Sequence, residues 1–176
     1  MSKYSEYHEA ICQAMFKLNK IDNTIFLGQQ VRITDFYNTL SSIPMHKRLE
    51  MPVAEELQLG MSIGLSLEGF LPISIFQRID FLPRCCDQLV NHLDLIKPLS
   101  ENKFNPKVII RTTIGSTKPL YTGLQHSKDL TKGFQALLNF PVIAVKTVKE
   151  VHDSYNEAIN CKTPIMIIEF QDLFNK

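Results

Sequence analysis

The chain has 176 residues, of which 44% are hydrophobic, and its formal net charge is +1. This length suits a single domain over residues 1–176. The basic residues are scattered along the chain, which does not favour nucleic-acid binding. The sequence has no run of about 18 apolar residues, so we expect no membrane span. The start lacks the apolar core of a signal peptide and the 4 cysteines lack metal-ligand or disulfide-framework spacing, so we expect a cytoplasmic protein with free thiols.

The first quarter of the chain alternates between helical and extended patterns. Apolar residues recur every three or four positions over residues 3–19, which predicts an amphipathic helix. The apolar run Thr24–Leu27, closed by Gly28, predicts a buried strand. We expect a short helix over residues 34–42 with Phe36, Tyr37 and Leu40 on its inner side, followed by a solvated turn at residues 45–48.

The next helix organises the rest of the chain. Pro52 disfavours a helical Met51, and Glu55 and Glu56 then fall in a first turn, where negative charge is favourable. The helix is predicted over about residues 54–68, with Gly69 as its C-terminal stop.

The remaining two thirds repeat the same alternation. In chain order we predict a strand at 71–76, a helix containing Cys85, Leu89, His92 and Leu93, a polar loop at 100–107, a strand at 107–112, a long loop with Gly115, Pro119 and Gly123, a helix at 131–138, a strand at 141–145, a helix at 148–160 and a strand at 164–170. The strands are continuous apolar runs, which is typical of a parallel sheet covered on both faces. The pattern therefore predicts a three-layer α/β/α fold with a mostly parallel sheet.

The segment Pro52-Val-Ala-Glu-Glu-Leu-Gln-Leu-Gly60 resembles the Pro-Ile-Ser-Glu-Ala-Gly-Phe-Val-Gly segment of the pyrimidine-binding domain of thiamine diphosphate enzymes. The resemblance is closest to the beta subunits of the 2-oxoacid dehydrogenases, with transketolase and deoxyxylulose-phosphate synthase further off. It implies that Glu55 contacts N1′ of the cofactor's aminopyrimidine and that Leu57 belongs to the cofactor-binding set. Glu56, Leu57 and Gln58 depart from the dehydrogenase pattern.

A second segment keeps the family's spacing between an aromatic residue and an Asp-Gln pair, here Phe81 and Asp87-Gln88. The resemblance implies that Phe81 stacks on the aminopyrimidine ring, because aromatic faces suit a flat heteroaromatic ligand. The alternative is that Phe81 is part of the core. Asp87 and Gln88 are interpreted as helix-packing or interface residues.

A third and a fourth segment follow the same order as in the family. Ile109-Ile-Arg-Thr-Thr-Ile-Gly115 matches the family's Val-Ile-Arg-Thr strand and its following Gly, and Thr122–Ser127 matches the family's Gly-small-X-X-His-Ser-Gln loop. The resemblance implies an active-site role for His126, since histidine moves protons best near neutral pH, whereas a loop histidine is otherwise usually solvated. Lys128 replaces the family's Gln, and Gln29 and Gln30 replace the two acids of a Gly-Glu-Asp-Val turn.

The resemblance covers nearly the whole chain but only half of a thiamine diphosphate site. The family's diphosphate-binding domain carries a Gly-Asp-Gly motif, and this sequence contains no Asp-Gly pair. We expect the diphosphate-binding and C-terminal domains to be absent, and a partner subunit, as in an α2β2 assembly, to hold the diphosphate and Mg²⁺. The implied function is one subunit, inactive alone, of a transferase or decarboxylase acting on a 2-oxo acid or ketose donor.

Two other readings stay open. The chain can be a degenerate pyrimidine domain kept as an assembly or regulatory subunit, which the changes at Gln29, Gln30, Glu56 and Lys128 favour. A buried Glu55 argues against it, because a carboxylate in an apolar interface is costly without a use. It can also be an unrelated α/β binding module whose motif order is coincidental.

Overall fold

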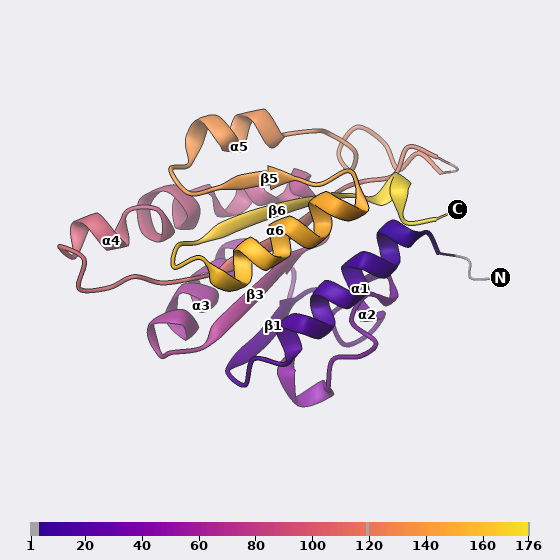
Figure 1. Cartoon of the computed structure of the whole chain (residues 1–176). Coiled ribbons are helices and arrows are strands. Elements are labelled where there is room, and N and C mark those ends of the chain that lie inside the picture. The colour runs from indigo at the N-terminus through magenta and orange to yellow at the C-terminus, as the bar shows by residue number, and fades with distance from the viewer. Residues whose placement is uncertain (1–3, 119, 176) are drawn as a thin grey trace.

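A parallel sheet forms the middle layer of the protein. The computed structural model describes residues 4–118 and 120–175, and within them six strands pair in the order β2-β1-β3-β4-β6-β5, all parallel (Figure 1). The strands are β1 (Thr24–Gly28), β2 (Arg48–Glu50), β3 (Leu71–Phe76), β4 (Ile109–Ile114), β5 (Val142–Ala144) and β6 (Ile165–Phe170). Helices cover both faces, which confirms the predicted three-layer α/β/α fold.

The helical elements lie between the strands in sequence. They are α1 (Glu6–Asn19), α2 (Asp35–Asn38), η1 (Met45–Lys47), α3 (Glu55–Leu67), η2 (Ile79–Cys85), η3 (Gln88–Leu93), α4 (Ile96–Leu99), α5 (Thr131–Leu137), α6 (Val148–Asn160) and η4 (Gln171–Leu173). None of those in the described residues combines the length and apolar character needed to cross a membrane.

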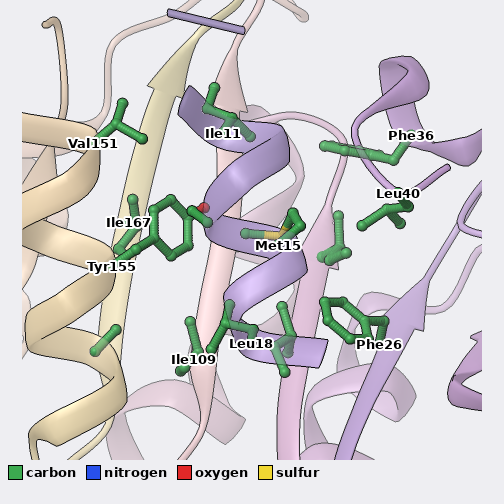
Figure 2. Close-up of a cluster of buried hydrophobic side chains, with 14 of the residues drawn as sticks. Ile11, Met15, Leu18, Phe26, Phe36, Leu40, Ile109, Val151, Tyr155 and Ile167 are labelled. Carbon is green, nitrogen blue, oxygen red and sulfur yellow. The ribbon is translucent and has the colours of Figure 1, made fainter. Parts of the chain in front are cut away.

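One face of the sheet is covered by α1 and α6, which lie side by side (Figure 1). The register aligns Phe26, Ile73, Ile109 and Ile165 across four strands, and these side chains all join the core on this face. Figure 2 shows Met15 and Leu18 of α1 and Tyr155 of α6 in the same cluster, with Ile109 and Phe26 on either side of Leu18. The apolar run of each strand therefore supplies one layer of the core.

The opposite face carries the elements that surround the candidate site. The neighbouring register row places Ile110 and Met166 on this side, where they pack with Leu59 of α3, Leu82 of η2 and Phe134 of α5. Because side chains alternate along a strand, a continuous apolar run fills both cores at once. This burial holds α3 and η2 against the sheet.

Most element boundaries agree with the sequence pattern. α1 begins after Ser5, whose hydroxyl accepts a hydrogen bond from the His8 amide at 3.2 Å, and Lys3, in the predicted helix, lies outside the described residues. α3 ends before Gly69, which has φ of +88° as expected of a C-terminal stop. Pro119 of the long loop also lies outside the described residues. The 4 cysteines are free thiols, as predicted.

The predicted helix over residues 34–42 is wrong. Asp35, Phe36, Tyr37 and Asn38 all have positive φ, between 40° and 60°, and form one left-handed turn. Phe36 and Leu40 are buried as the pattern predicts. The hydrophobic spacing was therefore correct, but contacts from other parts of the chain select the opposite hand.

The predicted solvated turn at residues 45–48 is also wrong in part. Met45–Lys47 form a short 3-10 turn, but Arg48 begins β2 and is only 6% exposed. Its guanidinium pairs with Asp35 and donates to the carbonyls of Ile43 at 2.8 Å and Val31 at 3.1 Å. A polar residue is buried here because the chain supplies acceptors for it.

The helix predicted to contain Cys85 and Leu93 is broken into three pieces. A 3-10 segment, η2, comes first and contains Pro83, which lacks the amide proton that an α-helix would use. It is followed by a π-helical turn, η3, and then by the short helix α4. The apolar residues of the pattern are nevertheless buried against α3 and the sheet.

Candidate functional site

Glu55 is the first residue of α3, at the end of the helix whose partial positive charge favours a carboxylate. The helix start is fixed to the sheet by Gln58, which is 1% exposed and donates to Ser74 Oγ at 3.1 Å and the Ile75 carbonyl at 3.0 Å. No side-chain cap satisfies the first turn. The sequence thus presents a carboxylate at a helix terminus near the carboxyl end of β3.

The Glu55 carboxylate is buried in the wall of a cavity of about 690 Å³ between α3 and the segment that follows β3. Its side chain is 4% exposed, and Oε2 has no hydrogen-bond partner among the described residues. Arg84 Nε lies 3.3 Å from Oε2, close enough for an ion pair, yet no hydrogen bond forms. Because the Arg84 side chain is 76% exposed, solvent screens this pair, and the Glu55 carboxylate in the cavity wall keeps unused acceptor capacity.

Leu57 and Gln88 line the same cavity. Leu57 is 51% exposed and gives the cavity an apolar patch next to Glu55. Gln88, interpreted from sequence as a packing or interface residue, approaches Gly60 closely, since a Cβ on Gly60 would lie 3.6 Å from Gln88 Oε1. Asp87 Oδ1 accepts a hydrogen bond from Asn91 Nδ2 at 2.7 Å.

The structure brings together two other predicted site residues, Phe81 and His126. Their rings pack edge to face, with centroids 5.6 Å apart and an interplanar angle of 88°. Phe81 lies on η2 and His126 on the loop after β4, and both side chains are half-buried. This contact joins two segments that are 45 residues apart in sequence.

The loop that carries His126 is held in place by its backbone. Gly123, with φ of +95°, accepts the His126 amide at 3.1 Å and the Ser127 hydroxyl at 2.9 Å. The Lys128 amide donates to Asp80 Oδ1 at 3.2 Å, so the loop is tied to η2 next to Phe81. The Lys128 side chain itself is exposed.

The predicted site residues therefore form two groups. Glu55 and Leu57 line the cavity, whereas Phe81 and His126 form the ring pair, and no hydrogen bond or ion pair between described residues joins Glu55 to Phe81 or His126. The two groups meet at η2, which carries both Phe81 and Arg84. Within residues 4–118 and 120–175, no three His, Cys, Asp or Glu side chains gather in a way that could hold a metal ion.

Gln30, which together with Gln29 replaces the acids of the family turn, lies next to a carboxylate supplied by another strand. Glu50 of β2 accepts the Gln30 amide at 2.5 Å and the Arg32 amide at 2.8 Å. Sequence reasoning missed Glu50 and Arg84. Glu50 has no motif around it and is placed by the pairing of β2 with β1, whereas Arg84 lies between Phe81 and Asp87 of the second family segment but is not one of the residues that the resemblance singles out.

Similarity to known proteins agrees with this arrangement, although no family model matches the chain. A pyruvate dehydrogenase E1 component subunit beta from Cyanidium caldarium is 31% identical over 127 residues, which are 72% of this chain and 38% of that protein. The beta subunit of an acetoin:2,6-dichlorophenolindophenol oxidoreductase from Cupriavidus necator is 27% identical over 126 residues, 72% of this chain and 37% of that subunit. The chain thus spans about two fifths of the length of these curated relatives.

Among solved structures, a split gene transketolase described as an inactive beta4 tetramer matches with a TM-score of 0.70 and 18% identity, covering 94% of this chain and 50% of that one. The all-parallel sheet and the shared fold define a domain of the transketolase-like class. Together with the sequence relatives, they make this chain a transketolase-like pyrimidine-binding domain, homologous to part of the pyruvate dehydrogenase E1 beta subunit.

Proposed function

We propose that this chain is the pyrimidine-binding subunit of a split thiamine diphosphate-dependent enzyme, acting on a 2-oxo acid or ketose donor by decarboxylation or by two-carbon or aldehyde transfer. The observation that carries the proposal is the Glu55 carboxylate, which is 4% exposed in the wall of the cavity and whose buried Oε2 has no hydrogen-bond partner among the described residues. An unsatisfied buried acceptor costs about 1–3 kcal/mol, which a ligand that donates a hydrogen bond to the carboxylate would offset.

The residues present fit the pyrimidine end of the cofactor. Glu55 offers an acceptor for a protonated ring nitrogen, Leu57 an apolar surface, and Phe81 an aromatic ring. When bound, thiamine diphosphate supplies a carbanion that adds to a carbonyl, and it then serves as the electron sink. We propose that the diphosphate and Mg²⁺ are held by a partner subunit, in an α2β2 assembly in the cytoplasm, and that this chain is inactive alone.

Each residue has a distinct proposed role. Glu55 shares a proton between its carboxylate and the ring nitrogen of the cofactor, in a site that becomes drier when the partner covers it. Desolvation of a carboxyl favours that sharing. Phe81 stacks on the pyrimidine, and the edge-to-face contact with His126 fixes the orientation of its ring. His126 moves protons to and from the substrate at an imidazole nitrogen.

The experiment is a pull-down from the native cell extract followed by calorimetric titration of thiamine diphosphate and Mg²⁺ into the recovered complex. We expect binding by the complex and not by either chain alone. Glu55→Gln should assemble normally but lose cofactor activation, whereas Glu68→Gln, at the exposed end of the same helix, should behave as wild type. Full turnover by the Glu55→Gln complex would refute the role of Glu55.

A degenerate assembly or regulatory subunit is the second candidate, and Arg84 favours it because its guanidinium lies against the carboxylate that the cofactor would need. A recovered complex that ignores the cofactor would support this alternative. The third reading, an unrelated α/β module, is excluded by the sequence relatives.

A further inference from the structure

Three arginines are buried in the described residues, and they differ in how their charge is neutralised. Arg48 pairs with Asp35, and Arg111 pairs with Glu169. Arg78 is 9% exposed, yet no carboxylate of the described residues lies within 4.0 Å of its side-chain nitrogens. Burying a charge is costly unless it is paired, so Arg78 stands out as a cation that the chain does not neutralise.

The hydrogen bonds of Arg78 leave one edge of the guanidinium without an acceptor among the described residues. Nη1 donates to the hydroxyl of Tyr37, to the Gln77 carbonyl at 2.7 Å and to Thr113 Oγ1 at 3.3 Å. Nε is buried without a partner, and no described group accepts from Nη2. The Nε–Nη2 edge is the fork that binds carboxylate and phosphate groups with two parallel hydrogen bonds.

The position of Arg78 connects it to the candidate site. It lies two residues after the end of β3, at the carboxyl edge of the sheet, where open α/β folds bind ligands. A Cβ placed on Gly115 would lie 2.8 Å from Arg78 Nε and 1.8 Å from the His126 carbonyl oxygen, so Arg78 and the His126 backbone lie against the same glycine. His126 in turn contacts Phe81.

We propose that Arg78 binds the anionic group, a carboxylate or a phosphate, of the donor substrate, and so makes this site select anionic over neutral donors. The identification of the ligand as the donor rests on the proposed function. Arg48 and Arg111 have a carboxylate of the chain as counter-ion, and the anionic group of the substrate takes this place for Arg78. Its binding places the charged end of the substrate beside the ring pair of Phe81 and His126.

The test titrates three probes into the complex of the full chain with its partner: pyruvate, inorganic phosphate and the neutral ketone hydroxyacetone. Pyruvate or phosphate should bind, and hydroxyacetone should not. The anion that binds more tightly shows whether Arg78 recognises a carboxylate or a phosphate. Arg78→Gln should weaken anion binding by about tenfold or more, because hydrogen bonds to a charged group are lost. Tyr37→Phe, which removes a neighbouring hydroxyl and keeps the guanidinium, should retain it.

Arg78→Lys keeps the charge without the fork and provides a second variant if Arg78→Gln does not fold; it should show a smaller loss. Unchanged anion affinity in either variant, or no anion binding by the wild-type complex, would overturn the proposal. Loss of partner assembly in Arg78→Gln, without anion binding by the wild type, would show that the partner supplies the counter-ion. The cofactor titration tests the proposed function independently. If the complex does not bind thiamine diphosphate but binds anions through Arg78, the proposed function is refuted and the anion site is supported.

Discussion

Arg111 of β4 and Glu169 of β6 form a two-bond ion pair inside the protein. Arg111 Nε and Nη2 donate to the two carboxylate oxygens of Glu169 at 2.8 and 2.9 Å, and both side chains are 0% exposed. Tyr155 of α6 donates to Glu169 Oε1 at 2.6 Å, and Arg111 Nη1 donates to Thr39 Oγ1 at 2.9 Å. Burial raises the pKa of Tyr155 well above its ordinary value, which keeps it a donor. The pair thus links two strands, a helix and the segment after the left-handed turn.

Glu169→Gln should destabilise the protein by about 3–5 kcal/mol, since it leaves the Arg111 charge buried without its partner. Urea denaturation measures this change. Lys149→Ala, which removes the exposed ion pair with Asp153, is the control and should leave the denaturation midpoint unchanged. A Glu169→Gln protein as stable as the wild type would mean that the pair contributes no net stability.

Gly115→Ala should displace the loop that carries His126. The added Cβ would meet the His126 carbonyl oxygen at 1.8 Å, and overpacking of this kind costs about 1–3 kcal/mol. Gly64→Ala on α3 is the matched control. No atom lies within 4 Å of the Cβ that it would add, so this variant should be as stable as the wild type or more stable by up to about 1 kcal/mol. Hydrogen exchange of the amides of residues 123–128 should increase only in Gly115→Ala.

His8 should make stability fall on acidification. It is 3% exposed, its Nε2 lies 2.8 Å from the Tyr37 carbonyl, and burial lowers its pKa below the ordinary 6.5. Below pH 6.5 His8 is protonated in the unfolded chain but stays neutral in the folded one. The free energy of unfolding therefore falls as the pH falls toward the pKa of His8 in the folded state, with a slope of at most about 1.4 kcal/mol per pH unit.

Denaturation of the wild type and of His8→Gln at pH 7.5 and pH 5.5 measures this contribution. The variant should lose less stability between the two pH values than the wild type. His46→Gln, at an exposed position of η1, should retain the wild-type pH dependence. Equal losses in His8→Gln and the wild type would assign the acid sensitivity to other groups.

Cys85 should resist alkylation in the native protein although Cys86 is its neighbour. Burial raises the pKa of the Cys85 thiol to about 12, and the side chain is fully buried. The thiolate is the reactive form, so iodoacetamide at pH 8 should label the half-buried Cys86 first and Cys85 only after urea is added. Mass spectrometry of the labelled peptides decides the order, and simultaneous labelling would contradict it.

The sequence predicted the parts of the fold that depend on long apolar runs. The strands β1, β3, β4 and β6 and the helices α1, α3 and α6 appear where the periodicity places them. The strand β2 was missed, because three residues with a buried arginine carry no strand pattern, and it exists through pairing with β1. The 3-10 and π-helical segments after β3 were predicted as one helix, because apolar residues every three or four positions do not show how tightly each turn is wound or which carbonyl each amide bonds.

The candidate site was predicted where residues belong to a motif. Family segments pointed to Glu55, Leu57, Phe81 and His126, and their functional roles stay predictions. Arg78 and Arg84 were not singled out, because a sequence does not show which guanidinium will lack a carboxylate or lie against Glu55. Such relationships depend on the arrangement of η2 between the sheet and α3.

The left-handed turn at residues 35–38 has a consequence for the order of folding. Each non-glycine residue in this conformation costs about 1–2 kcal/mol, so the segment does not favour the turn by itself. Three contacts from other parts of the chain hold it: Arg48 forms an ion pair with Asp35, the His8 ring bonds the Tyr37 carbonyl, and Arg78 donates a hydrogen bond to the Tyr37 hydroxyl. These anchors come from α1, β2 and the end of β3, so the turn can form only after those elements have assembled. A peptide of residues 29–47 alone would lose it.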